Sequence, residues 1–480
     1  PEIRTLLETA ETYAKKPAVE ALVSNSSEPK LWQTFLLAEI YDVRGYLDRK
    51  LYHLSAAIKN YREADRLARS NTDRFQSIQA EILNNLAFAL SEQGFVDEAR
   101  EYAQQALRIR LQFASDHDIA RSRNTLARIE IRAGQPALAY QLAVQASETM
   151  QNLNSVWGKL LSLPVRAETL RKLAEQFTHA PAQQNKLFDE AIGWLQQAVQ
   201  MLNEQAQPSI ERKREIYQTL GCTYRSRART RQDRLQAYGQ SGAQDPQVLA
   251  DYQHAREWLE KALEVSRNGQ QPDLFVIDIL EDLAVTYINN DLYDQRYEEY
   301  LQQALDIIDA RYKNYVITPK RGFMNLPEAI RGYWRELGQI HLQLMIGFFG
   351  KYEYGYYTYN PDTKLREIKT PKNHTPFIFS PKPSDGDNNA VTHLVLMFGY
   401  LQHYDAESPM MKKARYLVLR ELKHQFTETE LKDMSQRAVY LADRIYKLPA
   451  STRDAIQHVF NQAITDLKRE SPLTEEGHHQ

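Results

Sequence analysis

The chain has 480 residues, and its 60 Lys and Arg nearly balance its 62 Asp and Glu, for a formal net charge of −2. This balance excludes a strong global attraction to nucleic acid or to an anionic membrane. Its 18 Gly and 19 Pro are few for this length, which disfavours a large β domain, whereas a hydrophobic content of 42% allows a continuous core.

The first predicted element, residues 1–29, is a short helix pair. Its apolar positions run from Leu6 to Val23, and it ends at Ser24. We expect it to be the tail of a preceding repeat. The chain begins at Pro1 with neither an initiator Met nor a signal segment, which suggests a fragment of a longer protein.

Residues 30–345 contain an internal repeat. The clearest copy has small or apolar residues at Leu86, Ala87, Gly94, Ala99, Ala103 and Ala106. The same residue types follow 40 positions later, at Leu126, Ala127, Gly134, Ala139, Ala143 and Ala146. Alanines three and four apart share one helix face and let a second helix approach closely, and a glycine where the chain reverses permits positive φ. Each unit is therefore predicted to be a helical hairpin that buries its apolar face against its neighbours.

This order of Leu-Ala-x-x-Leu, then Gly, then Ala-x3-Ala-x2-Ala resembles the tetratricopeptide repeat. The usual period of that family is about 34 residues, so a period of 40 implies longer helices, as in the long-period arrays of bacterial regulators. The resemblance implies an all-α fold, a right-handed tetratricopeptide-like α-α superhelix (solenoid) over residues 30–345.

Weaker copies extend the pattern in both directions. They open at Leu37-Ala38, Leu173-Ala174, Leu220-Gly221 and Leu283-Ala284, with a degenerate copy at Leu337-Gly338. In the copy that opens at Leu37, the closing Ala64 comes seven residues late. The copy that opens at Leu220 carries about 22 inserted residues around Gln232–Ala250, which we expect to form a loop insertion.

Residues 346–389 form a Tyr- and Pro-rich insert. Alternating tyrosines up to Tyr359 precede Asn360-Pro361-Asp362, a pattern typical of a small β-hairpin. These tyrosines either stack on a partner or pack the hairpin onto the solenoid, and the sequence leaves both alternatives open. Residues 390–480 are predicted to form a C-terminal helical cap and tail, with helices near 390–403, 409–426, 429–447 and 452–469.

The sequence has no Gly-rich phosphate-binding loop and no His-Glu-x-x-His motif. Asp385–Asn389 has the composition of a calcium-loop start, but Ala390 and Leu396 stand where that loop needs Gly and Glu. The single cysteine, Cys222, excludes an intrachain disulfide, suits a cytoplasmic location, and is better explained as a buried thiol than as a nucleophile. We therefore expect no catalytic residue, no cofactor and no metal.

The resemblance also implies a binding surface. In tetratricopeptide proteins the first helix of each hairpin lines a concave groove, at positions about five, two and one before the conserved Leu and two, five and six after it. On the second repeat, which opens at Leu86, these are Glu81, Asn84, Asn85, Phe88, Ser91 and Glu92. On the third repeat, which opens at Leu126, they are Arg121, Asn124, Thr125, Arg128, Ile131 and Arg132.

Asn side chains at such positions can grip a peptide backbone, and Arg can bind a carboxylate in bidentate fashion. The set thus resembles grooves that capture acidic or C-terminal peptide ends. It departs from them by carrying Arg where Lys is usual and by lacking a matching basic residue in the first repeat. An ordinary solvated helix face is the alternative.

Residues 211–234 are locally basic, with eight basic and three acidic side chains and a charge of +5. Arg225, Arg227 and Arg229 are candidates for contact with an anionic partner such as nucleic acid or nucleotide. The alternative is a solvated helix that neighbouring repeats neutralise. The alternation of Arg225 to Arg231, which spreads these side chains round the helix, favours that alternative.

The leading hypothesis is a protein- or peptide-binding scaffold, the ligand-sensing C-terminal part of a larger signalling or transcription-regulating protein. It rests on resemblance to the arrays that follow the ATPase core in STAND-type and maltose-regulator-type proteins. The alternatives are a free-standing peptide sensor of Rap type, a nucleic-acid- or nucleotide-binding repeat, and an enzyme with a site in residues 346–480. No membrane partner is expected, because the apolar stretches are too short to span a bilayer.

Overall fold

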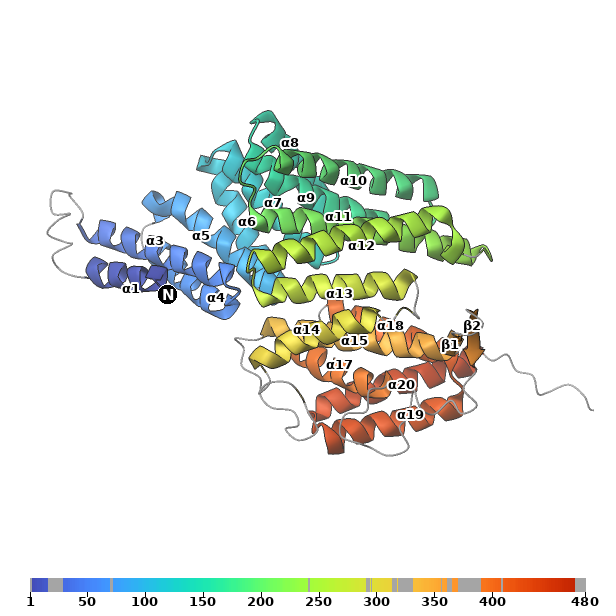
Figure 1. Ribbon diagram of the computed structural model, residues 1–480. Helices are drawn as coiled ribbons and strands as arrows, with labels where there is room; N and C mark the ends of the chain where they lie inside the picture. Colours follow the sequence, from blue (N-terminus) through green and yellow to red (C-terminus); the bar gives the residue numbers. More distant parts are fainter. Residues whose placement is uncertain are drawn as a thin grey trace, which may run out of the picture. The chain divides into compact units, whose positions relative to one another are not determined.

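The structure, a computed structural model, describes residues 2–15, 29–69, 72–240, 242–290, 294, 296–312, 317, 331–354, 356–360, 365–369, 390–406 and 409–470 (Figure 1). The chain divides into two compact units, Pro1–Val276 (unit 1) and Ile277–Gln480 (unit 2). Helices make up nearly all of the described elements, which confirms the all-α repeat fold. The predicted domain boundaries near residues 29, 345 and 389 remain predictions.

Unit 1 begins with α1 (Glu2–Ala14) and continues as helical hairpins. The first helices of these hairpins are α3 (Pro29–Lys50), α5 (Thr72–Gln93), α7 (Asp116–Arg132), α9 (Val156–Ala174) and α11 (Ile210–Ala237). The second helices are α4 (Leu54–Ala68), α6 (Val96–Phe113), α8 (Pro136–Asn152), α10 (Pro181–Asn203) and α12 (Pro246–Asn268). Each first helix packs against its own second helix, and each second helix from α4 to α10 packs against the next first helix.

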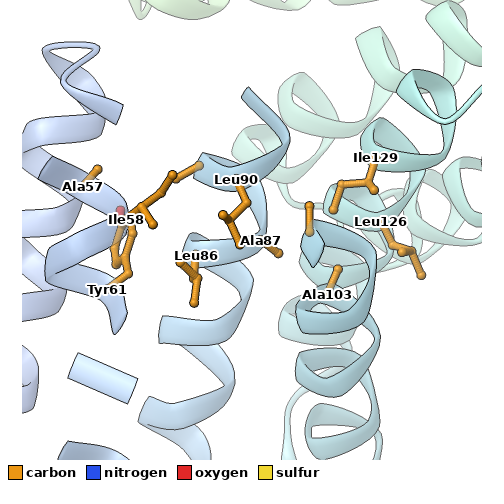
Figure 2. Close-up of a cluster of buried hydrophobic side chains, with 11 residues drawn as sticks. Ala57, Ile58, Tyr61, Leu86, Ala87, Leu90, Ala103, Leu126 and Ile129 are labelled. Atoms are coloured by element: carbon orange, nitrogen blue, oxygen red, sulfur yellow. The ribbon is translucent and has the colours of Figure 1, made fainter. Parts of the chain in front are cut away.

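Buried alanines and leucines join consecutive hairpins into one core. One cluster combines Ala57 and Tyr61 of α4, Leu86 and Leu90 of α5, and Ala103 of α6 with residues of α7 (Figure 2). All five of these side chains are 0% exposed. The repeated small residues therefore do what their spacing predicted, since they let helices of successive hairpins approach closely.

Positive φ angles mark the reversals inside the hairpins. Gly94 has a φ of 97° and Gly134 a φ of 74°, which confirms the prediction for these two glycines. In the first hairpin the helix continues past Gly45 to Lys50, and Tyr52 takes the positive φ of 60° instead. This longer first helix accounts for the delay of seven residues in that repeat.

The residues of the insertion predicted around Gln232–Ala250 belong mostly to helices α11 and α12, and only a few of them form a loop. The 28-residue α11 continues to Ala237, a short 3-10 helix spans Gly242–Gln244, and the 23-residue α12 begins at Pro246. Asp245 caps α12 by accepting hydrogen bonds from the backbone N–H groups of two residues in its first turn. The expected loop insertion is therefore wrong for most of its length.

Helix α13 (Asp273–Asn290) crosses the boundary between the units. Unit 2 then contains α14 (Arg296–Tyr312), α15 (Arg331–Tyr354), α17 (Ala390–Asp405), α18 (Pro409–Gln425), α19 (Glu428–Tyr440), a π-helical turn (Leu441–Ile445) and α20 (Ala450–Glu470). Helix α15 packs against α17, and α17 also contacts α18, α19 and α20. The four helices expected after residue 390 are thus confirmed.

The predicted hairpin in the Tyr-rich insert is confirmed as two antiparallel strands. Strand β1 (Tyr356–Asn360) pairs with β2 (Leu365–Lys369), and Tyr356 lies opposite Lys369. The predicted turn at Pro361-Asp362, the Pro-rich stretch and the calcium-loop-like segment lie outside the described residues.

Candidate functional site

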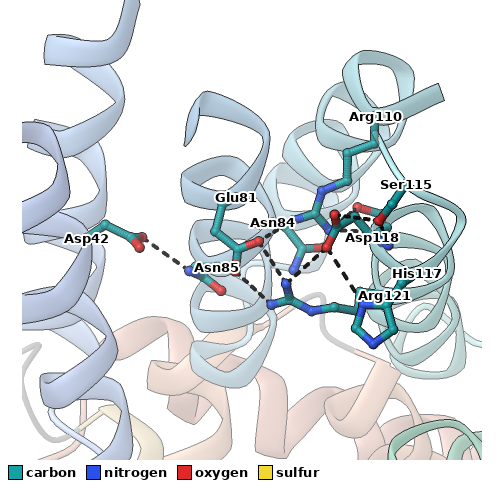
Figure 3. Close-up of polar contacts among 10 residues, drawn as sticks. Asp42, Glu81, Asn84, Asn85, Arg110, Ser115, His117, Asp118 and Arg121 are labelled. Atoms are coloured by element: carbon teal, nitrogen blue, oxygen red, sulfur yellow. Dashed lines mark hydrogen bonds and ion pairs between the residues drawn. The ribbon is translucent and has the colours of Figure 1, made fainter. Parts of the chain in front are cut away.

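The groove positions predicted on α5 and α7 lie next to one another in the structure, and we call them the first-helix face. Its members are Glu81, Asn84, Asn85, Phe88, Ser91, Glu92, Arg121, Asn124, Thr125, Arg128, Ile131 and Arg132. Arg121 donates to Glu81, with Nη2 and Oε1 2.7 Å apart (Figure 3). Arg132 donates to Ser91 Oγ at 3.0 Å and also pairs with Glu92. These contacts join positions 40 or 41 residues apart, so the repeat period itself places the partners side by side.

The asparagines of this face hold helices together. Asn84 is 5% and Asn124 is 3% exposed. Asn84 Oδ1 accepts from Ser122 Oγ at 3.3 Å, and Asn124 Nδ2 donates to the carbonyl of Leu161 at 3.1 Å. Asn85 Nδ2 donates to Asp42 Oδ1 of α3 at 3.1 Å (Figure 3). Of the three, Asn85 is half-buried and the other two are buried. The prediction that they grip a partner's backbone remains untested.

Glu81 connects this face to a residue that the sequence analysis missed. Arg110, on the second helix α6, is 3% exposed and pairs with Glu81. Its Nη1 also donates to the carbonyl of Asp118 at 3.0 Å and to Ser122 Oγ at 2.9 Å. Glu81 therefore sits between two guanidinium groups, those of Arg110 and Arg121, and its charge is compensated within the fold.

Two ion pairs join α3 and α7, the first helices of the first and third hairpins, to the start of α11. Arg128 of α7 pairs with Glu215, and Lys50 at the end of α3 pairs with Glu211. Burial would raise the pKa of Glu215, but Arg128 and Arg212 lower it to about 2. Whole hairpins separate these partners in the chain, so unit 1 must curve enough to bring the N-terminal part of α11 back to α3 and α7.

Acids of α11 itself and of the neighbouring helices α10 and α12 compensate the basic segment. Arg227 donates to both carboxylate oxygens of Asp251, at 2.6 and 2.8 Å, and contacts Asp189 at 2.6 Å. Arg229 pairs with Asp233 at 2.9 Å. Arg225 lies 3.6 Å from the sulfur of the buried Cys222. These contacts favour the alternative of a neutralised helix, and anion binding by Arg225, Arg227 and Arg229 stays an untested prediction.

Exposed apolar side chains on α3 are part of the same surface but were missed. Trp32 is 49%, Leu36 40%, Val43 44% and Tyr46 46% exposed. The offsets that placed Asn84 and Arg128 on the first-helix face place Trp32, Leu36 and Val43 there as well when they are counted from Leu37. The family offsets, counted from Leu37, are therefore sufficient to identify these three side chains in the first repeat.

The structure adds two observations on other kinds of site. Within the described ranges, no three His, Cys, Asp or Glu side chains are grouped so that they could hold a metal ion. In the same part of the chain, no helix has the length and apolar character needed to cross a membrane.

Comparisons with known proteins agree with the repeat pattern. Residues 78–152, from within α5 to the end of α8, match the family model described as tetratricopeptide repeat. No curated protein matches the chain. Among solved structures, a Rap protein complexed with Competence and Sporulation Factor is 11% identical, with 98% of this chain and 97% of that chain covered and a TM-score of 0.46.

Two further structures are similar over different lengths. The apo form of RapI is 12% identical, covers 88% of this chain and 99% of its own, and has a TM-score of 0.36. BtubC from P. vanneervenii is 16% identical, covers 58% of this chain and 94% of its own, and has a TM-score of 0.32. The two hairpins that the family model matches, and the helical hairpins that continue them, make this chain a tetratricopeptide-like helical repeat scaffold.

Proposed function

We propose that the chain is a protein- or peptide-binding scaffold whose partner contacts the first-helix face. The observation that carries the proposal is that the arginines of this face are paired and yet reach solvent: Arg132 is 35%, Arg121 26% and Arg128 22% exposed. A partner carboxylate can replace an internal glutamate at such a guanidinium, because one charge-assisted hydrogen bond is exchanged for another. Acidic or C-terminal peptide ends are therefore the first ligands to test at these arginines.

We further propose that the chain serves as the ligand-sensing part of a larger signalling or transcription-regulating protein. Support comes from the 40-residue period and its resemblance to the sensor arrays of ATPase regulators. The sequence of the complete gene tests this role, because a nucleotide-binding ATPase domain upstream of Pro1 is the expected result. A gene that encodes only this chain would contradict it and would favour a free-standing sensor.

A peptide array tests the binding face. The wild type and the double variant Arg128→Glu/Arg132→Glu are each applied to an array of peptides with acidic and neutral C-terminal ends. We expect the double variant to lose peptides that the wild type binds, because a glutamate repels the partner carboxylate. Unchanged binding of every peptide would show that these arginines do not form the site.

Arg62→Glu is the matched control. Arg62 lies on the second helix α4, is 52% exposed, and pairs with Glu98 at 2.7 Å, so its reversal also breaks an Arg–Glu pair. We expect the control to bind like the wild type. Circular dichroism of all three proteins shows whether a loss of binding reflects a loss of fold.

A further inference from the structure

The exposed side of α3 has an apolar stripe. Trp32, Leu36, Val43 and Tyr46 follow one another at intervals of four, seven and three residues, which places them on one face of a helix. Each of these four side chains is at least 40% exposed. We call this surface, together with Glu39, the α3 stripe.

The other sides of α3 are covered within the fold. Gly45 faces the ring of Tyr61 on α4, where an added Cβ would lie 2.6 Å from the ring. Tyr41 donates to Glu11 of α1 at 2.7 Å, and Arg44 pairs with the same carboxylate. The α3 stripe is therefore apolar surface that packing against α1 and α4 does not use, and contiguous exposed apolar surface of this kind marks interaction sites.

Two carboxyl groups give the stripe a negative character. Glu39 lies on the stripe between Leu36 and Val43, and Asp42 lies beside it towards α5. Burial raises the pKa of Glu39, and the charge of Glu81 raises it further. Burial also raises the pKa of Asp42 to about 6, with added repulsion from Glu81 and Glu39 and partial relief from Asn85 and Arg49.

The cations of α3 near these carboxyls have other contacts as well. Arg49, which lowers the pKa of Asp42, lies over the rings of Phe88, at 4.9 Å, and Tyr46, at 5.2 Å. Lys50 is engaged with Glu211 at the other end of the helix. A cation brought by a partner would thus meet an electrostatic environment that favours it.

We propose that the α3 stripe binds an amphipathic segment of a partner protein that presents aliphatic or aromatic side chains with Lys or Arg among them. The apolar side chains of the segment cover Trp32, Leu36 and Val43, and its cations approach Glu39 and Asp42. An acidic segment is disfavoured, because it would add negative charge beside carboxyls that already repel one another. This inference rests on the proposed scaffold function and names the class of one ligand, whereas the arginines of α7 select carboxylates at a separate part of the face.

The test uses two fluorescein-labelled synthetic peptides with the same amphipathic Leu pattern. One carries Lys at every polar position and the other carries Glu. Fluorescence anisotropy gives the Kd of each for the wild-type chain at low and at moderate salt. We expect the Leu–Lys peptide to bind more tightly than the Leu–Glu peptide, and added salt to reduce that preference.

Variants then locate the site. Leu36→Ser/Val43→Ser removes apolar contact at exposed positions, and we expect it to weaken Leu–Lys binding by about tenfold. Leu153→Ser/Val156→Ser is the matched control at the α8–α9 turn, where the two side chains are 46% and 49% exposed. The control is expected to bind like the wild type.

Glu39→Lys separates charge from apolar contact. With this variant the Leu–Lys peptide is expected to bind several-fold more weakly and the Leu–Glu peptide more tightly than with the wild type. The inference is overturned if the Leu–Lys peptide does not bind, if the Leu–Glu peptide binds equally well, or if the two α3 variants bind like the wild type. If that happens while array peptides still depend on Arg128 and Arg132, the scaffold function stands and only the α3 site is lost.

Discussion

Arg128 on α7 and Glu215 on α11 form an ion pair between the third and the fifth hairpin of unit 1. Their side chains are 22% and 14% exposed, so water screens the pair only partly. The fourth hairpin lies between the partners in the chain, so the pair joins two parts of unit 1 that only the curvature of the helical stack brings together. The partner proposed for Arg128 would compete with Glu215 for the guanidinium, so we expect binding to be coupled to the shape of unit 1 at this pair.

A double-mutant cycle measures that coupling. Arg128→Ala and Glu215→Ala are each expected to lower the free energy of unfolding, and the coupling between them to be about 2 kcal/mol. The same cycle on the exposed pair Arg62–Glu98 should give about 0.5 kcal/mol. Urea denaturation of the single and double variants supplies these values. Equal coupling in the two cycles would show that Arg128–Glu215 has no special part in the fold.

The pair also has a defined pH dependence. The pKa of Glu215 in the fold is about 2, well below the usual value for Glu. Its contribution is therefore complete above about pH 4.3 and is lost as the pH falls towards 2. The Arg128–Glu215 coupling measured at pH 7 should shrink steadily in the same denaturation experiment below about pH 4. A coupling that persists at pH 2 would contradict the assigned ion pair.

Glycine substitutions test the backbone argument for the turns. A Cβ added at Gly134 or at Gly193 would meet no atom of the described residues within 4 Å, but Gly134 has a φ of 74° whereas Gly193 lies inside α10. Gly134→Ala should lower the stability of unit 1 by about 1 kcal/mol, since an L-residue is strained there. Gly193→Ala should raise it by about 0.5 to 1 kcal/mol, because alanine favours helix. Equal shifts of the unfolding midpoint for both variants would argue against a conformational cause.

The repeat core was predictable because each part of it is local in sequence. Leu86 and Ala103 sit in a pattern that returns after 40 residues, and the packing of a helical hairpin depends on that spacing alone. The positive φ of Gly94 was predictable for the same reason, because the repeat pattern places this glycine at the turn between two helices. The insertion before α12 was predicted to be a loop, and this prediction was wrong. Most of the inserted residues favour helix, and they extend α11 and begin α12.

The network on the candidate site was less predictable. The offsets placed Arg128 on the first-helix face, but its partner Glu215 lies 87 residues away, and the pairing depends on curvature that accumulates over several hairpins. Arg110 belongs to a second helix, for which the family pattern assigns no groove position. Trp32 and Leu36 could have been found, because the same offsets applied to the weak first repeat point to them.

Two buried histidines predict an acid sensitivity of unit 2. His341 on α15 and His393 on α17 lie Nδ1 to Nδ1 at 2.9 Å, and Tyr400 stacks on His341. Burial lowers the pKa of His341 to about 3; burial and then the charge of His341 lower the pKa of His393. Below about pH 6.5 these histidines take up protons in the unfolded chain but stay neutral in the folded state. The free energy of unfolding therefore falls as the pH drops from 6.5.

The expected loss is about 1.4 kcal/mol per pH unit for each histidine. Hydrogen exchange of α15 and α17 amides between pH 7 and pH 5, corrected for intrinsic exchange rates, measures it. His341→Phe/His393→Leu should remove most of the slope. His458→Gln, at an exposed position of α20, is the control and should keep the slope. A wild-type slope equal to that of the double variant would rule out the buried pair as its source.

A buried glutamate predicts the opposite trend with pH in the same unit. Glu281 on α13 is 6% exposed, and its Oε2 has no hydrogen-bond partner among the residues that the structure describes. Burial raises its pKa well above the usual value, and the neighbouring Glu336 and Asp278 raise it further. The folded state therefore holds a proton that the unfolded chain releases above about pH 4.3, and stability falls as the pH rises from there.

Glu281→Gln keeps the shape of the side chain and cannot ionise. We expect the variant to match the wild type near pH 5 and to be more stable by about 1 to 3 kcal/mol at pH 8, because the cost of a buried charge or of its neutralisation is removed. Thermal unfolding of unit 2 at both pH values checks this difference. Asp306→Asn on α14 is the control, since Asp306 accepts a hydrogen bond from Gln302 at an exposed site. If Glu281→Gln were less stable than the wild type at pH 8, Glu281 would have to be ionised and paired in the fold.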